Sequence, residues 1–149
     1  MREQADHYDA DLLLRLYDLR REEGLRQARD WFIREFRAES MEDVYKRFPF
    51  GSKENDSYRM VLSYWEMAAS MVNRGLINEE LFFENSGELW TVWVKVKHLL
   101  PEARVMWKNP KLYQNLAILA EKYEKWMEVR APGAVDLMLE QVKMLAAKK

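Results

Sequence analysis

The stretch DSYRMVLSYWEMAASMVNRG, residues 56–75, decides the fold because its apolar residues leave almost no face for solvent. At 100° per residue, one apolar stripe lies beside a second stripe that holds three methionines. Together the stripes cover roughly 280° of the helix surface. We therefore predict a central helix over residues 56–74, with the other helices packed around it. The first stripe contains Tyr58, Val61, Leu62, Trp65, Ala68, Ala69 and Val72, and the second contains Met60, Tyr64, Met67 and Met71.

The composition fits one domain over residues 1–149. Hydrophobic residues make up 48% of the chain and aromatic residues 13%, which is enough for a single core. The formal net charge of −1 favours neither nucleic acid nor an anionic membrane as a partner. Cysteine is absent, so thiol chemistry is excluded and a cytoplasmic location is expected. The sequence shows no signal peptide and no membrane span, so we expect no membrane insertion.

Helical spacing and turn residues divide the part of the chain before the central helix. Leucines at helical spacing predict a first helix over about residues 6–23. Gly24 either ends this helix or bends it into the next. Ser40 is the expected N-cap of a short helix, and residues 48–55 are the expected loop. Asp56 or Ser57 should then cap the central helix.

Helical spacing and turn residues also divide the part of the chain after the central helix. Gly75 is expected at the end of the central helix, and Asn78 at the start of a short one. Residues 86–100 fit a helix, although the alternating valines also fit a half-buried strand. We predict a helix, because a lone strand would have unpaired edges. Asn109 should open the next helix and a last amphipathic helix should close the core, giving an all-α bundle of about six to seven helices.

Two segments, YRMVLSYWEMAASMVNRGLINEELFF and LWTVWVKVKHLLPEAR, resemble a bacterial family known only as a domain of unknown function. The resemblance covers about residues 57–126. Many members of that family carry a membrane span ahead of the helical domain, and this sequence departs from them in lacking one. The resemblance implies a helical fold but no activity, cofactor or catalytic residue. It is carried by Tyr64, Glu66, Ala68, Gly75, Leu76, Ile77, Trp93 and Arg104.

The sequence contains no catalytic, cofactor-binding or metal-binding motif. His7 and His98 lie outside the HExxH and ExxH spacings of metal sites. No serine lies in a GxSxG or SxxK motif, and no glycine-rich phosphate loop is present. The acidic residues at positions 6–11 favour a solvated helix start over a cation site. We predict no enzyme, cofactor or metal, although acid and base could still come from carboxylates far apart in sequence.

The aromatic residues favour a protein-interaction or regulatory domain. Phe48, Phe50, Phe82, Phe83 and Trp90 cannot all be buried easily in one small bundle, so we expect them to form an interaction surface. A homodimer is one form that this contact could take. Phe48 is the ring most expected to dock onto the bundle as part of a lid.

Two other binding sites remain as alternatives. One is a cavity beside the central helix, for a ligand. The other is the basic stretch 95–111, for nucleic acid. Nucleic acid is the weaker alternative, because acidic residues lie just upstream and Trp107 should pack under the bend at Pro101. The three methionines of the central helix should lie in the core rather than form a groove for a partner.

Glu66 and Arg104 are the charged residues that we expect to be drawn inside the bundle. Glu66 lies at the centre of the polar strip of the central helix, and Arg104 follows the bend at Pro101. A guanidinium would keep a buried carboxylate ionised through two parallel hydrogen bonds. We therefore predict a structural ion pair between these two residues.

Overall fold

The computed structural model describes residues 4–147, and within them the chain forms nine α-helices and one short 3₁₀ helix. No strand occurs in this range, so the all-α prediction is confirmed, with slightly more helices than expected. Residues 86–100 contribute helices rather than a strand. The helices are α1 (His7–Arg21), α2 (Glu23–Glu35), α3 (Met41–Arg47), α4 (Lys53–Asn73), α5 (Glu79–Asn85), α6 (Glu88–Val96), η1 (Lys97–Leu99), α7 (Leu100–Met106), α8 (Gln114–Arg130) and α9 (Ala134–Ala147).

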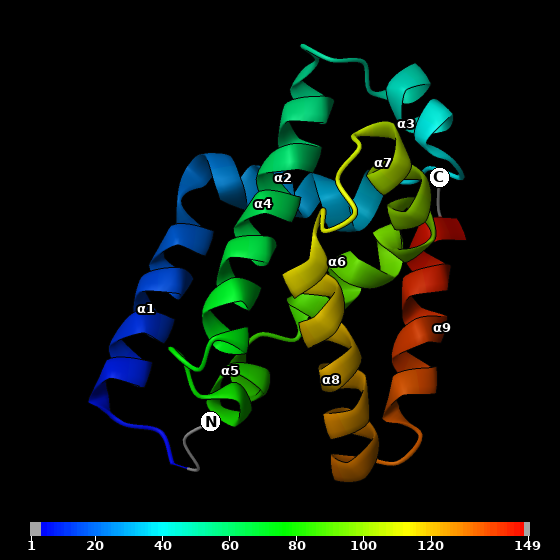
Figure 1. The fold of residues 1–149 in the computed structure, drawn as a ribbon. Helices are drawn as coiled ribbons and strands as arrows, with labels where there is room; N and C mark the ends of the chain where they lie inside the picture. Colours follow the sequence, from blue (N-terminus) through cyan, green and yellow to red (C-terminus); the bar gives the residue numbers. More distant parts are fainter. Residues whose placement is uncertain (1–3, 148–149) are drawn as a thin grey trace.

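The helix α4 lies at the centre of the bundle (Figure 1). Its backbone approaches α2 and α8 closely, and α1 less closely. The helix α1 flanks it on one side, whereas α8 and then α9 follow on the other (Figure 1). The apolar pattern of residues 56–74 therefore identified the organising helix, and the looser approach of α1 leaves room beside it.

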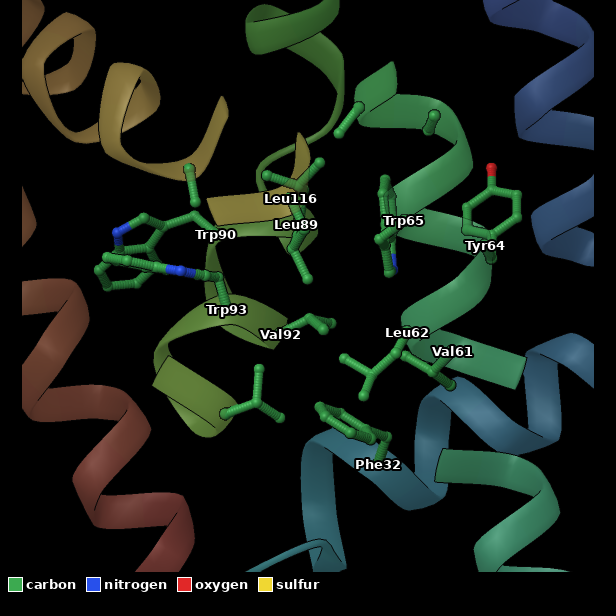
Figure 2. Close-up of a cluster of buried hydrophobic side chains, with 14 of the residues drawn as sticks. Phe32, Val61, Leu62, Tyr64, Trp65, Leu89, Trp90, Val92, Trp93 and Leu116 are labelled. Carbon is green, nitrogen blue, oxygen red and sulfur yellow. The ribbon is translucent and has the colours of Figure 1, made fainter. Parts of the chain in front are cut away.

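The core is built on one face of α4. Figure 2 shows Trp65 of α4 facing Leu89 of α6 and Leu116 of α8, with Phe32 of α2 below them. The side chains of these residues are at most 1% exposed. The second stripe of α4 behaves differently, because Met60 and Met67 are 42% and 37% exposed. The prediction that the three methionines lie in the core is therefore wrong for Met60 and Met67, whereas Met71 is partly buried and packs against the core.

Several helix ends follow their local signals. Ser40 and Asn78 cap α3 and α5 through their side-chain oxygens. At the end of α4, the N–H of Leu76 donates to the carbonyl of Met71, and Gly75 has a φ of +76°. This is a Schellman motif, in which the glycine adopts the left-handed conformation that a Cβ disfavours.

Other helix ends differ from the predictions. The first helix is broken at Glu22, whose extended backbone separates α1 from α2 and whose carboxylate caps α2. The cap of α4 is Ser52, because its hydroxyl accepts the N–H of Asn55, and Asn55 is itself held by the carbonyl of Phe48. The helix α8 begins at Gln114 rather than at residue 110, and no side chain of its own turn caps it.

Candidate functional site

An apolar groove of about 330 Å³ lies beside the central helix. Its volume is at the lower end of the range found for small-molecule sites. We call it the α1 groove, because α1 provides half of its lining. The lining comprises Leu13, Leu14, Leu16, Tyr17 and Arg20 of α1, Tyr64 and Trp65 of α4, Phe82 and Asn85 of α5, and Ser86.

Two hydrogen bonds fix α1 as a wall of this groove. The hydroxyl of Tyr64 donates to the carbonyl oxygen of Leu16, across 48 residues of sequence. Asp9 is fully buried, and its carboxylate accepts the N–H of Asn78 at 2.8 Å. The expectation that the N-terminal acidic residues are all solvated is therefore wrong for Asp9. These bonds position α1 against α4 and the start of α5 without closing the space between them.

One wall of the groove holds a guanidinium stacked on aromatic rings. The central carbon of the Arg20 guanidinium lies 5.3 Å from the centroid of the Trp65 ring and 5.7 Å from that of Tyr17. Burial raises the pKa of Tyr64, whereas the charges of Arg20 and Arg29 act in the opposite direction. The positive charge of Arg20 therefore acts on Tyr64, in the wall of the groove that α4 forms.

Two buried donors on this wall have no acceptor. In the part of the chain that the structure describes, Arg20 Nε and Trp65 Nε1 have no hydrogen-bond partner. The Trp65 side chain is 1% exposed, so bulk water does not solvate its indole N–H. A buried N–H without an acceptor costs about 1 to 3 kcal/mol, and such groups are rare in folded proteins. Both donors belong to residues that line the α1 groove.

The neighbouring Arg29, unlike Arg20, is paired with an acidic side chain, Glu88, in the described residues. Arg29 Nε and Nη2 donate to the Glu88 carboxylate at 2.6 and 2.9 Å, and its Nη1 donates to the Arg20 carbonyl at 3.0 Å. Burial lowers the pKa of Arg29, but the hydrogen bonds and charge of Glu88 outweigh this and raise it. Sequence reasoning missed this pair, because 59 residues separate its members and no spacing pattern connects them.

Three other hollows in the described residues lack this combination. A hollow of about 350 Å³ between α2 and α4 is lined partly by Lys53, Glu54 and Asp56. Another of about 300 Å³ lies over the Arg29–Glu88 pair. A smaller one of about 110 Å³ lies near Tyr58. None of these linings includes one of the buried polar atoms that lack a partner among residues 4–147.

The structure does not bring the predicted aromatic surface together. Phe82, Phe83 and Trp90 are 1%, 4% and 1% exposed, because α5 and α6 carry them into the core. Phe48 is half-buried and packs edge-on against Trp31, with their ring centroids 5.2 Å apart. Phe50 is 56% exposed. The prediction of a shared surface is therefore wrong for the three buried residues, of which one, Phe82, lines the α1 groove.

The predicted ion pair between Glu66 and Arg104 is also wrong. The Glu66 carboxylate instead accepts the backbone N–H of Leu116 at 2.8 Å and the side-chain amide of Asn115 at 2.9 Å. Arg104 Nε donates to the Leu112 carbonyl at 3.0 Å. Both residues therefore hold the backbone around the start of α8. We expected the guanidinium of Arg104 to donate hydrogen bonds to Glu66. The N–H groups at the uncapped N-terminus of α8 donate them instead.

The basic stretch 95–111 is only partly available to a partner. Lys95 Nζ donates to the carbonyls of Phe32 and Ile33 at the end of α2, both at 2.7 Å. Burial lowers the pKa of Lys95 to about 8, with the charge of Arg37 as a lesser cause. Trp107 is 51% exposed, so the expectation that it packs under the bend is wrong.

No group of three or more His, Cys, Asp or Glu side chains in residues 4–147 is arranged to hold a metal ion. Among the helices of the same range, none combines the length and the hydropathy that crossing a bilayer requires.

The chain was compared with known proteins at the level of family, sequence and structure. The model of one family, described as a domain of unknown function (DUF4760), matches residues 6–126. No curated protein and no solved structure matches the chain. The matched residues include the complete lining of the α1 groove, whereas α9 lies outside them.

Proposed function

The chain belongs to the DUF4760 family, whose description assigns no function, and we propose that it is a domain that binds a small, largely apolar molecule in the α1 groove. The proposal places the ligand beside the central helix α4, between α1 and α5.

The observation that carries the proposal is an apolar hollow whose rim is also apolar. Leu14 and Tyr17 on α1 are 63% and 48% exposed at this hollow, whereas Trp65 and Phe82 form buried walls. Exposed apolar side chains around a concave apolar lining are typical of a ligand site, because the ligand removes both surfaces from water. The groove lies between elements that hydrogen bonds hold in place, so it is preformed.

We propose binding without catalysis, because of the side chains that line the groove. The ionisable residues of the lining are Arg20, Tyr17 and Tyr64, and the lining contains no carboxylate and no histidine. General acid–base catalysis near neutral pH mostly uses those two kinds of group. The hydroxyl of Tyr64 is already donated to a backbone carbonyl.

A neutral fluorescent apolar dye, N-phenyl-1-naphthylamine, tests the proposal. We expect saturable binding of one dye per chain, and we expect Leu14→Trp, which places an indole across the groove, to weaken it at least about tenfold. Gln27→Trp is the matched control, because it puts the same side chain at the hollow between α2 and α4. Absence of saturable binding, or equal loss in both variants, would contradict the proposal.

A second candidate is contact with a protein partner, such as a second copy of this chain. It is favoured by the exposed apolar end of α7, where Val105, Met106 and Trp107 are 79%, 44% and 51% exposed. Phe50 extends this surface, since its ring centroid lies 5.9 Å from that of Trp107. Light scattering should give a dimer mass that Trp107→Ala reduces to the monomer mass. A strict monomer for the unsubstituted chain would contradict self-association.

A further inference from the structure

We infer that the ligand of the α1 groove is an amphipathic carboxylate, whose anionic head is bound by Arg20 and Trp65 and whose apolar chain lies along the groove. The inference rests on the proposed function and specifies the chemical class of the ligand.

The head group follows from the two donors that have no acceptor. Arg20 Nε and Trp65 Nε1 are both N–H groups, and both residues line the same groove. An acceptor placed between them would satisfy both hydrogen bonds. The central carbon of the Arg20 guanidinium lies 5.3 Å from the centroid of the Trp65 ring, so the two residues are neighbours on one wall of the groove.

The charge of the head group follows from the comparison with Arg29. Arg29 is held by a carboxylate of this chain, through its Nε and one terminal nitrogen. Arg20 has the same donors but is without an acidic partner in the described structure. Arginine recognises carboxylates through two parallel hydrogen bonds, which are about twice as strong as hydrogen bonds between neutral groups. A ligand carboxylate would therefore accept two hydrogen bonds from Arg20, as the Glu88 carboxylate does from Arg29.

The charges that act on Tyr64 at this groove do not oppose an anion, because two of the three are positive. Glu88 is the nearby acid that influences Tyr64 at the groove, and its charge is compensated by Arg29. Among the charges that act on Tyr64, the positive charge of Arg20 is therefore the one without an acid paired to it in the described part of the chain. The remainder of the ligand should be apolar, because Leu13, Leu16 and Phe82 line the same groove.

Three probes with the same alkyl chain separate the head group from the chain. Decanoate, decan-1-ol and decylammonium would be titrated by calorimetry below their micelle-forming concentrations. We expect decanoate to bind at least about tenfold more tightly than decan-1-ol, and decylammonium most weakly. The Trp65 indole N–H resonance, assigned with Trp65→Phe, should shift downfield with decanoate as the new hydrogen bond forms.

Arg20→Met should remove the preference for decanoate while leaving the binding of decan-1-ol within about twofold. Arg21→Met is the matched control, because the Arg21 guanidinium also lies over the Tyr17 ring, at 5.6 Å, but Arg21 does not line the groove. Arg20→Lys, which keeps the charge without the planar fork, should retain part of the preference. This variant keeps the inference testable if Arg20→Met does not fold.

Equal affinities for decanoate and decan-1-ol would overturn the inference while leaving the proposed function standing. Equal losses in Arg20→Met and Arg21→Met would also overturn it, since they would show attraction by the surface charge in general. If none of the three probes binds and the neutral dye also fails, the proposed function itself is wrong.

Discussion

Removing the Glu66 carboxylate should destabilise the start of α8, because Glu66 acts as the N-cap that this helix lacks. Tyr113 precedes the helix with a φ of +54° and offers no capping side chain. Glu66 reaches the site from α4 and accepts the N–H of Leu116 at 2.8 Å and the amide of Asn115 at 2.9 Å. The perturbations that test this role are Glu66→Ala and the isosteric Glu66→Gln.

The magnitude follows from those two hydrogen bonds, which are shorter than the third that Glu66 accepts, from the backbone N–H of Asn115 at 3.3 Å. Hydrogen bonds to a charged group contribute about 1.5 to 3 kcal/mol each, and Glu66 is partly exposed, so water can replace part of each bond. Taking the lower end for both bonds, Glu66→Ala should lower the free energy of unfolding by about 3 kcal/mol. Glu66→Gln keeps an acceptor for Leu116 but loses the charge, and should cost about half as much.

Arg104 provides the comparison that decides between capping and ion pairing. Arg104→Met removes one bond, from Nε to the Leu112 carbonyl, and should cost about 1.5 kcal/mol. Because Glu66 and Arg104 share no partner, their costs should add in the double variant, to within about 0.5 kcal/mol. An ion pair would instead make the double variant recover stability, because neither charge would be left alone.

Urea denaturation followed by far-ultraviolet circular dichroism measures these costs. For a chain of this size, 1 kcal/mol corresponds to about 2 to 4 °C in the melting temperature, so Glu66→Ala should melt roughly 6 to 12 °C lower. Ser63→Ala is the control on the same polar strip and should change little. Recovery of 1 kcal/mol or more in the double variant, or an unchanged stability of Glu66→Ala, would refute the capping argument.

Three further predictions concern stability. Burial lowers the pKa of Lys95 to about 8, so between pH 8 and about 10.5 the unfolded chain binds more protons than the folded chain, and the stability should rise with pH. Above this range the buried tyrosines, whose pKa values are raised, should oppose the rise. Urea midpoints measured across this pH range should show the rise, and Lys95→Met should abolish it. Phe48→Ser should cost about 2 kcal/mol and Phe50→Ser little, because only Phe48 packs against the core; equal melting temperatures would contradict this. Gly75→Ala should cost about 1 kcal/mol from its left-handed backbone, and Gly75→Asn less; an unchanged melting temperature for Gly75→Ala would show that the turn can relax.

The parts of the fold that the sequence predicted depend on neighbours close in the chain. The apolar stripes of α4 lie within one helix, and the caps Ser40 and Asn78 satisfy N–H groups three residues away. The Gly75 turn likewise needs only the last turn of α4. Local signals of this kind are visible in the residue order, because the groups that interact are a few positions apart.

The errors at helix starts come from contacts that the local signals do not contain. Ser52 caps α4 in preference to Asp56 because Asn55, three residues after Ser52, is also anchored to the Phe48 carbonyl. At α8, Asn109 forms only a local turn, through its bond to the N–H of Lys111. The helix begins later, where Glu66 of α4 meets it.

The candidate site was predictable only as a cavity beside the central helix, without its residues. Its lining combines α1, α4 and α5, and only three-dimensional packing shows which faces of these helices stay apart. The sequence does show that Arg20 lies near the end of a helix, where basic residues are common. It cannot show that the Nε atom of this arginine is buried without an acceptor.

The distant polar contacts of this bundle show why Arg20 is informative. Arg29 is paired with Glu88, Glu66 caps α8, and Lys95 holds the end of α2, so these charged side chains satisfy groups on another helix. Arg20 lies in the same region and is stacked on Trp65, yet its Nε has no acceptor in the described structure. A buried donor costs stability unless something accepts its hydrogen bond. Arg20 lines the groove together with Trp65, whose indole N–H is also unsatisfied, and a ligand head group is the acceptor that we infer for both.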